Sequence, residues 1–468
     1  MKKIYLIGIC GVAMGSLAGI LAQYGYEVSG SDEHVYPPMS DKLREWGVPV
    51  FEGFSRENIG SPDMVIIGNA ISRGNPEAEH VLDARIPYMS MARAFTEIVM
   101  PGKEVIAVCG THGKTTTTAL LAHILETAGL SPSFFVGGVA RNYNSNFRIG
   151  EGRYFVIEGD EYDSAFFEKI PKFIVYRPHH CIMTSLEFDH ADIYSNIDEI
   201  ILWFKRLVSI IPGNGNIVYS GEYSVLNEVV KGSRSRLLRY GGADADYSVS
   251  PGAVDGEMIS LQVACRRGVL NSGSELIGSF NYQNILAAVS MAVELGVDTG
   301  KIQDAVRTFQ GVKRRQELLF SSDPLKIYED FAHHPTAIKA ILSSMRERYP
   351  SSVIWAIYEP RSATSRRNVF QDSLGESFLD ADHIAIKTPY KLSGIAEDQR
   401  IDIGAVVEGL RTHGRGAGIF NDVDDILEDI FSKMIFSQSN IIIIMSNGGF
   451  DGIYGKITQR ASVISGRC

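Results

Sequence analysis

Short apolar runs alternate with stretches of helical periodicity along most of the chain. Buried strands of parallel sheets are near-continuous hydrophobic runs, whereas an amphipathic helix repeats its apolar positions every three or four residues. The segments that predict strands include KIYLIGI (3–9), EVSGSD (27–32), MVIIGNAI (64–71), EVIAVCG (104–110), RYFVIEG (153–159), HHCIM (179–183), LKIYED (325–330), SSVIWAIY (351–358), HIAIK (383–387) and NIIIIM (440–445). Helical patterns follow several of them, as in AMGSLAGILAQYG (13–25) and TTTTALLAHILETAG (115–129).

This alternation predicts three α/β units with mainly parallel sheets. A chain of 468 residues is expected to hold two to four domains. MPGK at 100–103 is a candidate linker, and a further unit begins near GVKRRQELLF. We therefore expect domains at residues 1–102, 103–312 and 313–468.

Composition excludes several classes of protein. Hydrophobic residues make up 45% and charged residues 21%, and a formal net charge of −10 argues against nucleic acid as the main partner. The five scattered cysteines form no C-x-x-C pair, which favours a reducing compartment. Residues 1–22 imitate a signal peptide, but interrupting glycines and a following SDE favour the opening of a βαβ unit. With no uninterrupted apolar run of about 18 residues, we expect a cytoplasmic protein without membrane insertion.

The stretch VCGTHGKTTTTAL at 108–120 has the character of a phosphate-binding loop. The usual form, G-x-x-x-x-G-K-[ST], would place its first glycine at Val108, whereas the nearer glycine is Gly110. A strand before the loop and a helix after it are the required context, because N–H groups at a helix N-terminus bind phosphate. We interpret the motif as a shortened nucleotide loop in which Lys114 supplies charge and Thr115 a hydroxyl for Mg²⁺.

Acidic residues gather where two later strands end. The first cluster contains Glu158, Asp160, Glu161 and Asp163, and the second contains Glu187, Asp189, His190 and Asp192. Mg²⁺ prefers oxygen ligands and tolerates imidazole, and phosphoryl transfer needs such charges near the phosphates. A solvated acidic loop would explain either cluster alone. Two clusters after a G-K-T loop favour a metal site.

Three further features leave alternatives open. The N-terminal turn G-I-C-G-V-A-M-G, with Asp32 after the second strand, suits a nucleotide or nucleotide-sugar site or only a close-packed turn. Arg314 and Arg315 could bind phosphate or carboxylate, or form a surface pair. His333 and His334 are more often structural than catalytic when no partner is evident.

Six motifs in order resemble the bacterial muramyl (Mur) ligases over essentially the full chain. They are GTHGKTTTT, EGDEYD, EFDHADIY, SFNYQNILAA, GVKRRQE and EDFAHHPTAI. The resemblance implies an α/β fold with Rossmann-like N- and C-terminal domains around a central P-loop ATPase-like domain. It also implies an enzyme that uses ATP and Mg²⁺ to activate the lactyl carboxylate of UDP-N-acetylmuramate as an acyl phosphate, which an amine then attacks.

The resemblance assigns roles to individual residues. ATP would be bound by Gly110, Thr111, His112, Gly113, Lys114, Thr115, Thr116, Asn281, Asn284, Arg315 and Asp330. Mg²⁺ would be bound by Thr115, Glu158 and His190, and the catalytic group would be Lys114, Glu158, His190, Arg315 and Asp330. The UDP-sugar would be bound by Gly8, Gly11, Asp32 and His190.

The choice of amine rests on other stretches. GSDEHVYPPMS, YEPRSATSRR and MSNGGFDGIYGK are most similar to the branch of the family that joins UDP-N-acetylmuramate to the murein tripeptide L-Ala-γ-D-Glu-meso-diaminopimelate. Arg361, Arg366 and Arg367 would bind the peptide carboxylates. The alternative is the branch that adds L-alanine, which shares every ATP motif. We expect a monomer or weak dimer.

Two positions depart from patterns common in the family. Phe280 stands where a histidine commonly precedes the first asparagine of NYQN. Lys205 lies where several of these ligases carry a carbamylated lysine, or is an ordinary surface lysine. A regulatory nucleotide-binding protein and an oxidoreductase using the N-terminal turn remain as alternatives, but the second leaves the lysine loop unexplained.

Overall fold

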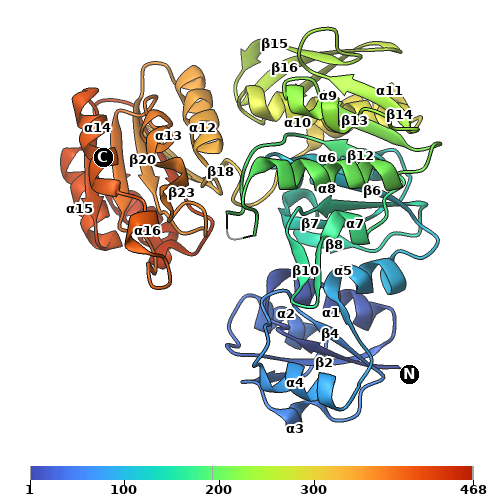
Figure 1. The fold of residues 1–468 in the computed structure, drawn as a ribbon. Helices are drawn as coiled ribbons and strands as arrows, with labels where there is room; N and C mark the ends of the chain where they lie inside the picture. Colours follow the sequence, from blue (N-terminus) through green and yellow to red (C-terminus); the bar gives the residue numbers. More distant parts are fainter. Residues whose placement is uncertain (1, 192, 466–468) are drawn as a thin grey trace.

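The computed structural model describes residues 2–191 and 193–465 and contains three α/β domains, with the N-terminal domain below the central one and the C-terminal domain beside it in the view of Figure 1. Asp192, named above in the second acidic cluster, and Cys468, one of the five cysteines, lie outside the described residues. The expected three-domain fold with mainly parallel sheets is confirmed. Across the described ranges, no helix combines the length and apolar character needed to cross a bilayer.

The N-terminal domain is a five-stranded parallel sheet in the order β3-β2-β1-β4-β5. Its strands are β1 Lys3–Ile7, β2 Glu27–Asp32, β3 Val50–Glu52, β4 Met64–Ile67 and β5 Tyr88–Ser90. Its helices are α1 Val12–Gln23, α2 Met39–Glu45, α3 Arg56–Ile59, α4 Pro76–Asp83 and α5 Met91–Ala94. The strand order reverses at β1, and ligands of such sheets bind at this point, beyond the carboxyl ends of the strands.

The central domain contains a seven-stranded sheet in the order β14-β13-β12-β6-β9-β7-β8, parallel except for β8. Its strands are β6 Glu104–Cys109, β7 Ser133–Ala140, β8 Ser145–Arg148, β9 Tyr154–Gly159, β12 His180–Met183, β13 Asn216–Ser220 and β14 Arg236–Tyr240. Its helices are α6 Lys114–Thr127, α7 Lys172–Val175, α8 Ile197–Ile210, α9 Ser224–Val229, α10 Ser279–Glu294 and α11 Thr299–Thr308. Adjacent strands β6, β9 and β12 end at one edge, so their following loops meet there.

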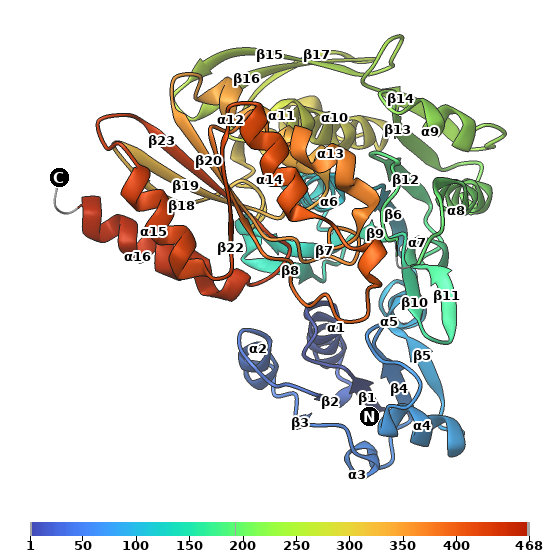
Figure 2. The ribbon, with the colours of Figure 1, turned by 60° about the vertical axis from the view of Figure 1, so that its left-hand side comes forward.

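Two small antiparallel sheets are added to this domain. A hairpin joins β10 Asp163–Ala165 to β11 Glu168–Pro171, and a three-stranded sheet contains β15 Ser248–Asp255, β16 Met258–Cys265 and β17 Gly268–Ser274. In Figure 2 the three-stranded sheet lies along the top, above α10 and α11. The apolar pattern did not predict these strands.

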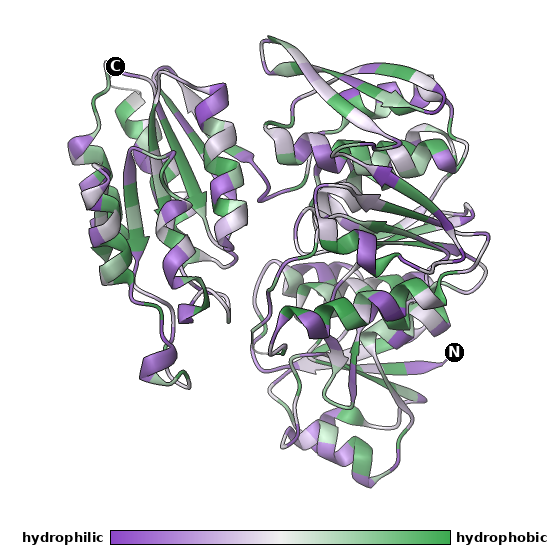
Figure 3. Cartoon of the chain, turned by 45° about the horizontal axis from the view of Figure 1, so that its top comes forward, coloured by the Kyte–Doolittle hydropathy of each residue, from purple (hydrophilic) through white to green (hydrophobic). Residues whose placement is uncertain are grey.

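The C-terminal domain is a six-stranded sheet in the order β18-β19-β23-β20-β21-β22, parallel except for β18. Its strands are β18 Glu317–Ser322, β19 Leu325–Asp330, β20 Val353–Tyr358, β21 His383–Lys387, β22 Gly416–Phe420 and β23 Asn440–Met445. Its helices are α12 Pro335–Arg348, α13 Gln371–Glu376, α14 Ile403–Thr412, α15 Val423–Lys433 and α16 Ile453–Ser465. Every residue of β23 is buried, and Figure 3 shows such hydrophobic strands between helices with polar outer faces.

The cores show which domains are firmly joined. One cluster of buried apolar side chains runs from Leu6 and Leu17 in the N-terminal domain to Phe155 and Phe204 in the central domain. The C-terminal domain has its own two clusters, one on each face of its sheet. The first two domains therefore share one apolar core, whereas the third packs against Ile277 and Phe280 of the central domain and is otherwise joined by polar contacts.

Candidate active site

The phosphate-binding loop connects β6 to α6 and is tightly packed. Gly110 and Gly113 have φ values of +135° and +79°, a region that favours glycine. A Cβ added at Gly110 would collide with the Thr184 hydroxyl, and one added at Gly113 with the amide oxygen of Asn284. The loop therefore needs glycine at both positions, and it ends at the N-terminus of α6, where N–H groups can bind phosphate.

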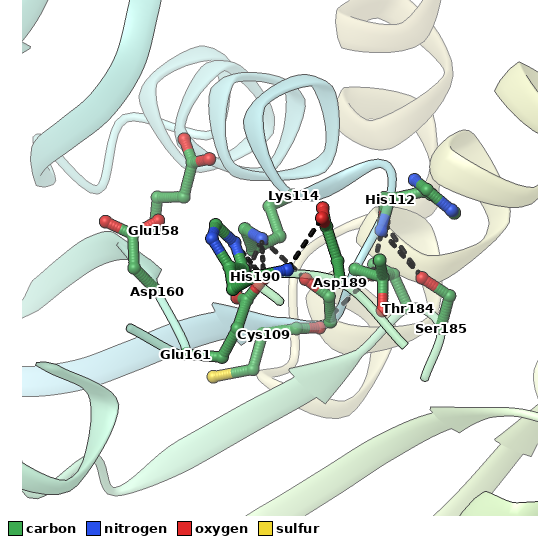
Figure 4. A network of polar contacts seen from close by, with 12 residues as sticks. Cys109, His112, Lys114, Glu158, Asp160, Glu161, Thr184, Ser185, Asp189 and His190 are labelled. Atoms are coloured by element: carbon green, nitrogen blue, oxygen red, sulfur yellow. Dashed lines mark hydrogen bonds and ion pairs between the residues drawn. The ribbon is translucent and has the colours of Figure 1, made fainter. Parts of the chain in front are cut away.

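Lys114, the first residue of α6, is buried beside the acidic end of β9. Its Nζ donates to the Gly110 carbonyl at 2.6 Å and to Glu161 Oε2 at 2.9 Å. Burial lowers the pKa of Lys114, but Glu161, Asp160 and Glu158 outweigh it and hold the pKa above its usual value. Figure 4 shows Lys114 between these acids on one side and His112, Thr184 and Ser185 on the other. The lysine is thus a fixed cation in front of the loop.

Glu158 also lies at the N-terminus of α6, where its carboxylate contacts Thr115. Glu158 Oε1 accepts from Thr115 Oγ1 at 3.0 Å, and its Oε2 accepts from the Gly137 N–H at 2.8 Å. Arg315 Nη2, from the start of the C-terminal domain, donates to the same Thr115 hydroxyl at 3.4 Å. Burial and the nearby Asp160 raise the pKa of Glu158. This carboxylate is therefore poised for a cation that would replace or supplement the Thr115 contact.

His190 and Glu161 form a second pair beside Lys114. His190 Nε2 lies 3.1 Å from Glu161 Oε1. Burial lowers the pKa of His190, but the bond to Glu161 and the charges of Glu161 and Asp189 raise it above its ordinary value. Burial raises the pKa of Glu161, but Lys114 and His190 together lower it. The site thus contains a buried carboxylate held between the Lys114 ammonium and the His190 imidazole.

The second acidic cluster connects the central and C-terminal domains. Glu187 Oε2 accepts from Thr336 Oγ1 at 2.8 Å, and Asp189 Oδ1 accepts from Thr364 Oγ1 at 2.9 Å. Burial raises the pKa of Asp189, but His190 and then His333 outweigh it and lower that pKa to about 2. These carboxylates are charged at neutral pH and bring the third domain to the loop.

The two candidate adenine asparagines are buried beneath the phosphate loop. Asn284 Nδ2 donates to Asn281 Oδ1 at 3.1 Å, and Asn281 Nδ2 donates to Gln316 Oε1 at 2.9 Å. Asn284 Oδ1 also accepts from Thr117 Oγ1 at 3.4 Å. Phe280 packs against the core of the C-terminal domain. In this arrangement the asparagines support the loop, and an adenine contact stays a prediction.

Neighbouring Arg314 and Arg315 have different surroundings. Arg314 donates to Glu329 and to the Ser446 and Gly448 carbonyls, all within the C-terminal domain. Arg315 instead reaches Thr115, with its guanidinium carbon 4.7 Å from the centre of the Phe331 ring. The structure therefore places Arg315, and not Arg314, at the phosphate loop.

Asp330 braces the turn that carries Arg315. Its carboxylate accepts from the N–H groups of Gln316 at 2.9 Å and Ala332 at 2.8 Å. Burial raises the pKa of Asp330 and outweighs the opposing effect of Arg315. Asp330 thus fixes residues 315–316 against the end of β19.

The remaining loop residues face the segment that follows β12. The Thr111 N–H donates to the Ser185 carbonyl, and the His112 N–H donates to Ser185 Oγ at 2.8 Å. Thr116 is buried in the first turn of α6. Lys205 lies on the exposed side of α8.

The N-terminal candidates form a separate turn at the end of β1. Gly8 has a φ of +83°, Gly11 precedes α1, and Asp32 Oδ2 accepts from the Cys10 N–H at 2.8 Å. The N–H groups of Gly8 and Ile9 both donate to the Ser31 carbonyl. His190, the fourth residue predicted for the UDP-sugar, lies instead beside Lys114 in the central domain.

A buried carboxylate that the sequence did not single out supports this turn. Glu77, on α4, is fully buried and accepts from Tyr5 Oη at 3.1 Å, the Ser55 N–H at 3.1 Å and Asn58 Nδ2 at 2.9 Å. It also accepts from the Ser31 hydroxyl. Because the Ser31 carbonyl holds the Gly8 turn, Glu77 joins α4 to that turn.

The three candidate peptide arginines lie in the segment after β20 but differ in their contacts. Arg361 Nη1 lies 3.4 Å from Glu359 Oε1, and its guanidinium carbon lies 4.1 Å from the centre of the Tyr390 ring. Arg366 donates to the carbonyls of Ser362, Tyr390 and Lys391 and so braces its own loop. Arg367 donates to the side chain of Gln399.

The resemblance to the Mur ligases implies an activity that needs ATP and Mg²⁺, and we expect Glu158→Ala and His190→Ala each to raise the Mg²⁺ concentration needed for half-maximal activity. Each substitution removes one side chain that we expect to bind Mg²⁺ beside the phosphate loop. Asp163→Ala is the matched control, because Asp163 belongs to the same acidic cluster but pairs with Lys169. Mg²⁺ titrations of both test variants that overlay the wild-type curve would exclude these residues as ligands.

Three protein-family models match successive segments of the chain. The models described as "Mur ligase family, catalytic domain", "Mur ligase middle domain" and "Mur ligase, glutamate ligase domain" match residues 3–101, 108–292 and 314–448. UDP-N-acetylmuramate–L-alanyl-γ-D-glutamyl-meso-2,6-diaminoheptandioate ligase of Escherichia coli (strain K12) is 36% identical over 97% of each chain. UDP-N-acetylmuramate–L-alanine ligase of Clostridium tetani is 33% identical over 96% of each chain.

A solved structure agrees with these similarities. The crystal structure of a murein peptide ligase from Psychrobacter arcticus 273-4 superposes with a TM-score of 0.73, at 34% identity and over 98% of each chain. The similarity thus covers all three domains, including the lysine loop with its acidic strand ends. The chain belongs to the Mur ligase family and is an ATP-dependent ligase that forms an amide bond.

Proposed function

We propose that the enzyme joins the lactyl carboxylate of UDP-N-acetylmuramate to the amino group of L-Ala-γ-D-Glu-meso-diaminopimelate, in the reuse of cell-wall peptide. The observation that carries this proposal is the 36% identity over 97% of the chain to the Escherichia coli ligase named for these substrates. We assign residues 1–102 to the UDP-sugar, 103–312 to ATP and 313–468 to the amine.

The site suits a reaction in which ATP activates a carboxylate. Lys114 and Arg315 reach the α6 N-terminus from opposite domains, so two fixed cations can offset phosphate charge as it shifts during transfer. Asp330 holds the Arg315 turn in place. The charged groups are already oriented before substrate arrives, which reduces the reorganisation needed at the moment of reaction.

The side-chain oxygens and the imidazole at the site are also suitable ligands for Mg²⁺. The Thr115 hydroxyl and Glu158 carboxylate lie 3.0 Å apart, and Glu161 and His190 lie 3.1 Å apart. Oxygen-rich sets with a tolerated imidazole suit this ion. We propose that Thr115 and Glu158 hold one Mg²⁺ and that His190 holds a second near the sugar carboxylate. When bound, Mg²⁺ would neutralise phosphate charge and orient the phosphoryl group.

One assay distinguishes the proposed function from its alternative. The purified enzyme is given ATP, Mg²⁺ and UDP-N-acetylmuramate with either the tripeptide or L-alanine, and ADP release and ligated product are both measured. We expect a much higher kcat/KM with the tripeptide. Efficient alanine ligation without tripeptide product would overturn the proposal.

The alternative is a UDP-N-acetylmuramate–L-alanine ligase. It is favoured by the 33% identity to the Clostridium tetani enzyme over 96% of the chain. A free amino acid, however, presents one carboxylate, whereas the tripeptide presents several. Of the three arginines after β20, Arg366 and Arg367 bond within their own domain, and Arg361 beside Tyr390 is the one we propose for an additional carboxylate.

Arg361→Ala is expected to raise KM for the tripeptide while leaving ATP affinity nearly unchanged. The guanidinium lies beside Tyr390 at the carboxyl end of the C-terminal sheet and suits a bidentate carboxylate contact. Arg411→Ala, on the exposed side of α14, is the control. Equal tripeptide KM for wild type and Arg361→Ala would remove this arginine from the peptide site.

Ligand binding is expected to favour a closed arrangement of the C-terminal domain. Arg315, Thr336 and Thr364 contact the central domain through a few polar bonds, and the only apolar side chains of the central domain that pack against the C-terminal core clusters of the described residues are Ile277 and Phe280. A nucleotide held by both domains shifts the population toward the closed form. Small-angle scattering should show compaction with an ATP analogue and UDP-sugar, and less in Thr364→Val. Identical profiles with and without ligands would contradict closure.

A further inference from the structure

Three side chains from distant parts of the sequence meet on the other side of the phosphate loop from Glu158. His112 lies in the loop itself, Glu187 follows β12, and His334 precedes α12. His112 Nε2 lies 3.2 Å from Glu187 Oε2, and His334 Nδ1 lies 3.8 Å from the same oxygen. The imidazole rings are 4.8 Å apart between centroids. We call His112, Glu187 and His334 the inter-domain triad.

Two imidazoles and one carboxylate are a ligand set typical of divalent transition metals. Zn²⁺ is bound by histidine nitrogen and carboxylate oxygen at about 2.0–2.2 Å, with three protein ligands and an open fourth position in many sites. Donors around such an ion lie roughly 3.3 Å apart in tetrahedral geometry. The separation of His112 Nε2 and Glu187 Oε2 matches this value, that of His334 Nδ1 and Glu187 Oε2 is 3.8 Å, and one ligand atom from each of the three residues lies within 4.8 Å of the others.

The protonation states agree with this geometry. Burial and then the nearby His112 lower the pKa of His334 to about 4, so its ring is neutral at pH 7. Burial raises the pKa of Glu187, but His112 and then Thr336 outweigh it and lower that pKa to about 2, so it is a carboxylate. Both groups are therefore in the form that binds metal.

The nitrogen of His334 that lies near Glu187 is Nδ1, not the unpartnered Nε2. The His334 side chain is 7% exposed, and its Nε2 has no hydrogen-bond partner among the described residues. Its Nδ1 accepts the Thr336 N–H at 3.2 Å and so caps α12. Coordination through Nδ1 would replace this long hydrogen bond with a stronger metal–nitrogen bond.

We propose that the inter-domain triad is a binding site for a divalent transition-metal ion, with Zn²⁺ the best match to its ligands. This site is distinct from the proposed Mg²⁺ ligands Thr115, Glu158 and His190. The proposal does not depend on which amine the enzyme uses. Because His334 belongs to the C-terminal domain and the other two ligands to the central domain, a bound ion favours the closed arrangement.

The test is calorimetric titration of the full-length enzyme with Zn²⁺ in millimolar Mg²⁺, which occupies the oxygen-rich sites. Three variants each remove one ligand with little other change. They are His112→Asn, Glu187→Gln, which keeps an acceptor for Thr336, and His334→Asn, which keeps an N-cap residue on α12. His413→Asn, at the exposed C-cap position directly after α14, is the matched control.

We expect one Zn²⁺ equivalent to bind the wild type and His413→Asn, and to bind each ligand variant roughly tenfold or more weakly. Co²⁺ should give visible absorption of a four-coordinate site in the wild type and lose it in His334→Asn. Small-angle scattering should show Zn²⁺-dependent compaction only where the three ligands are intact. Equal Zn²⁺ affinity in wild type and all three ligand variants would overturn the proposal, as would a Co²⁺ spectrum that His334→Asn leaves unchanged.

Discussion

Replacing Lys114 by methionine is expected to lower kcat by about two to three orders of magnitude. One positioned group that stabilises transition-state charge in comparable sites contributes roughly 3–4 kcal/mol. Lys114 is such a group, because its ammonium is fixed by Gly110 and Glu161 at the N-terminus of α6. Steady-state kinetics with saturating ATP and amine measures the effect.

Methionine is a better replacement than alanine because Lys114 is buried. It keeps most of the side-chain volume, whereas alanine would leave a cavity beside Glu161. Glu161 retains His190 as a partner, so we expect a folded protein by circular dichroism. Lys103→Met, at the other end of β6, is the control and should keep its activity. A Lys114→Met enzyme with near wild-type turnover would refute the phosphate role of this lysine.

Replacing Glu77 by alanine is expected to destabilise the protein by about 3 kcal/mol. Four donors converge on this fully buried carboxylate, and each buried donor left without a partner costs roughly 1–3 kcal/mol, part of which local rearrangement recovers. Calorimetry should show the first thermal transition lowered by about 6 °C or more. KM for the UDP-sugar should rise as well, because Ser31 loses the contact that holds the Gly8 turn.

Glu79→Ala is the matched control for Glu77→Ala. Glu79 lies on the same helix but pairs with the exposed Arg73 at the surface. Exposed ion pairs contribute about 0–1 kcal/mol, so its removal should change the transition little. Equal shifts for the two variants would mean that burial of Glu77 contributes nothing beyond a surface contact.

The pattern of apolar runs predicted the fold class because buried parallel strands leave a direct trace in sequence. The four consecutive isoleucines of β23 and the run EVIAVC of β6 are examples. Strands β15 to β17 left no such trace. Most of β15 is exposed, and its sequence SVSPGAVD contains proline and glycine, so burial imposes no continuous hydrophobic run on it.

The candidate site was predictable only as far as its motifs are local. Lys114 and Thr115 are set by one loop, and the structure brings both to the acidic strand end. Which acid meets Lys114 could not be predicted, because the backbone turns sharply after β9 and aims Glu161 at the lysine. The inter-domain triad joins positions far apart in sequence, and only the packing of two domains brings them together.

Each main sheet is built from one uninterrupted stretch of chain: residues 3–90, 104–240 and 317–445. No strand of an earlier sheet pairs with a strand from a later domain. The first two domains can therefore fold in order as the chain leaves the ribosome. The phosphate loop would then form while Arg315, Asp330 and His334 are still being synthesised. A nascent chain would therefore carry a folded nucleotide loop that cannot yet use ATP for ligation. The enzyme would become active only when the C-terminal domain, the last to be synthesised, has folded.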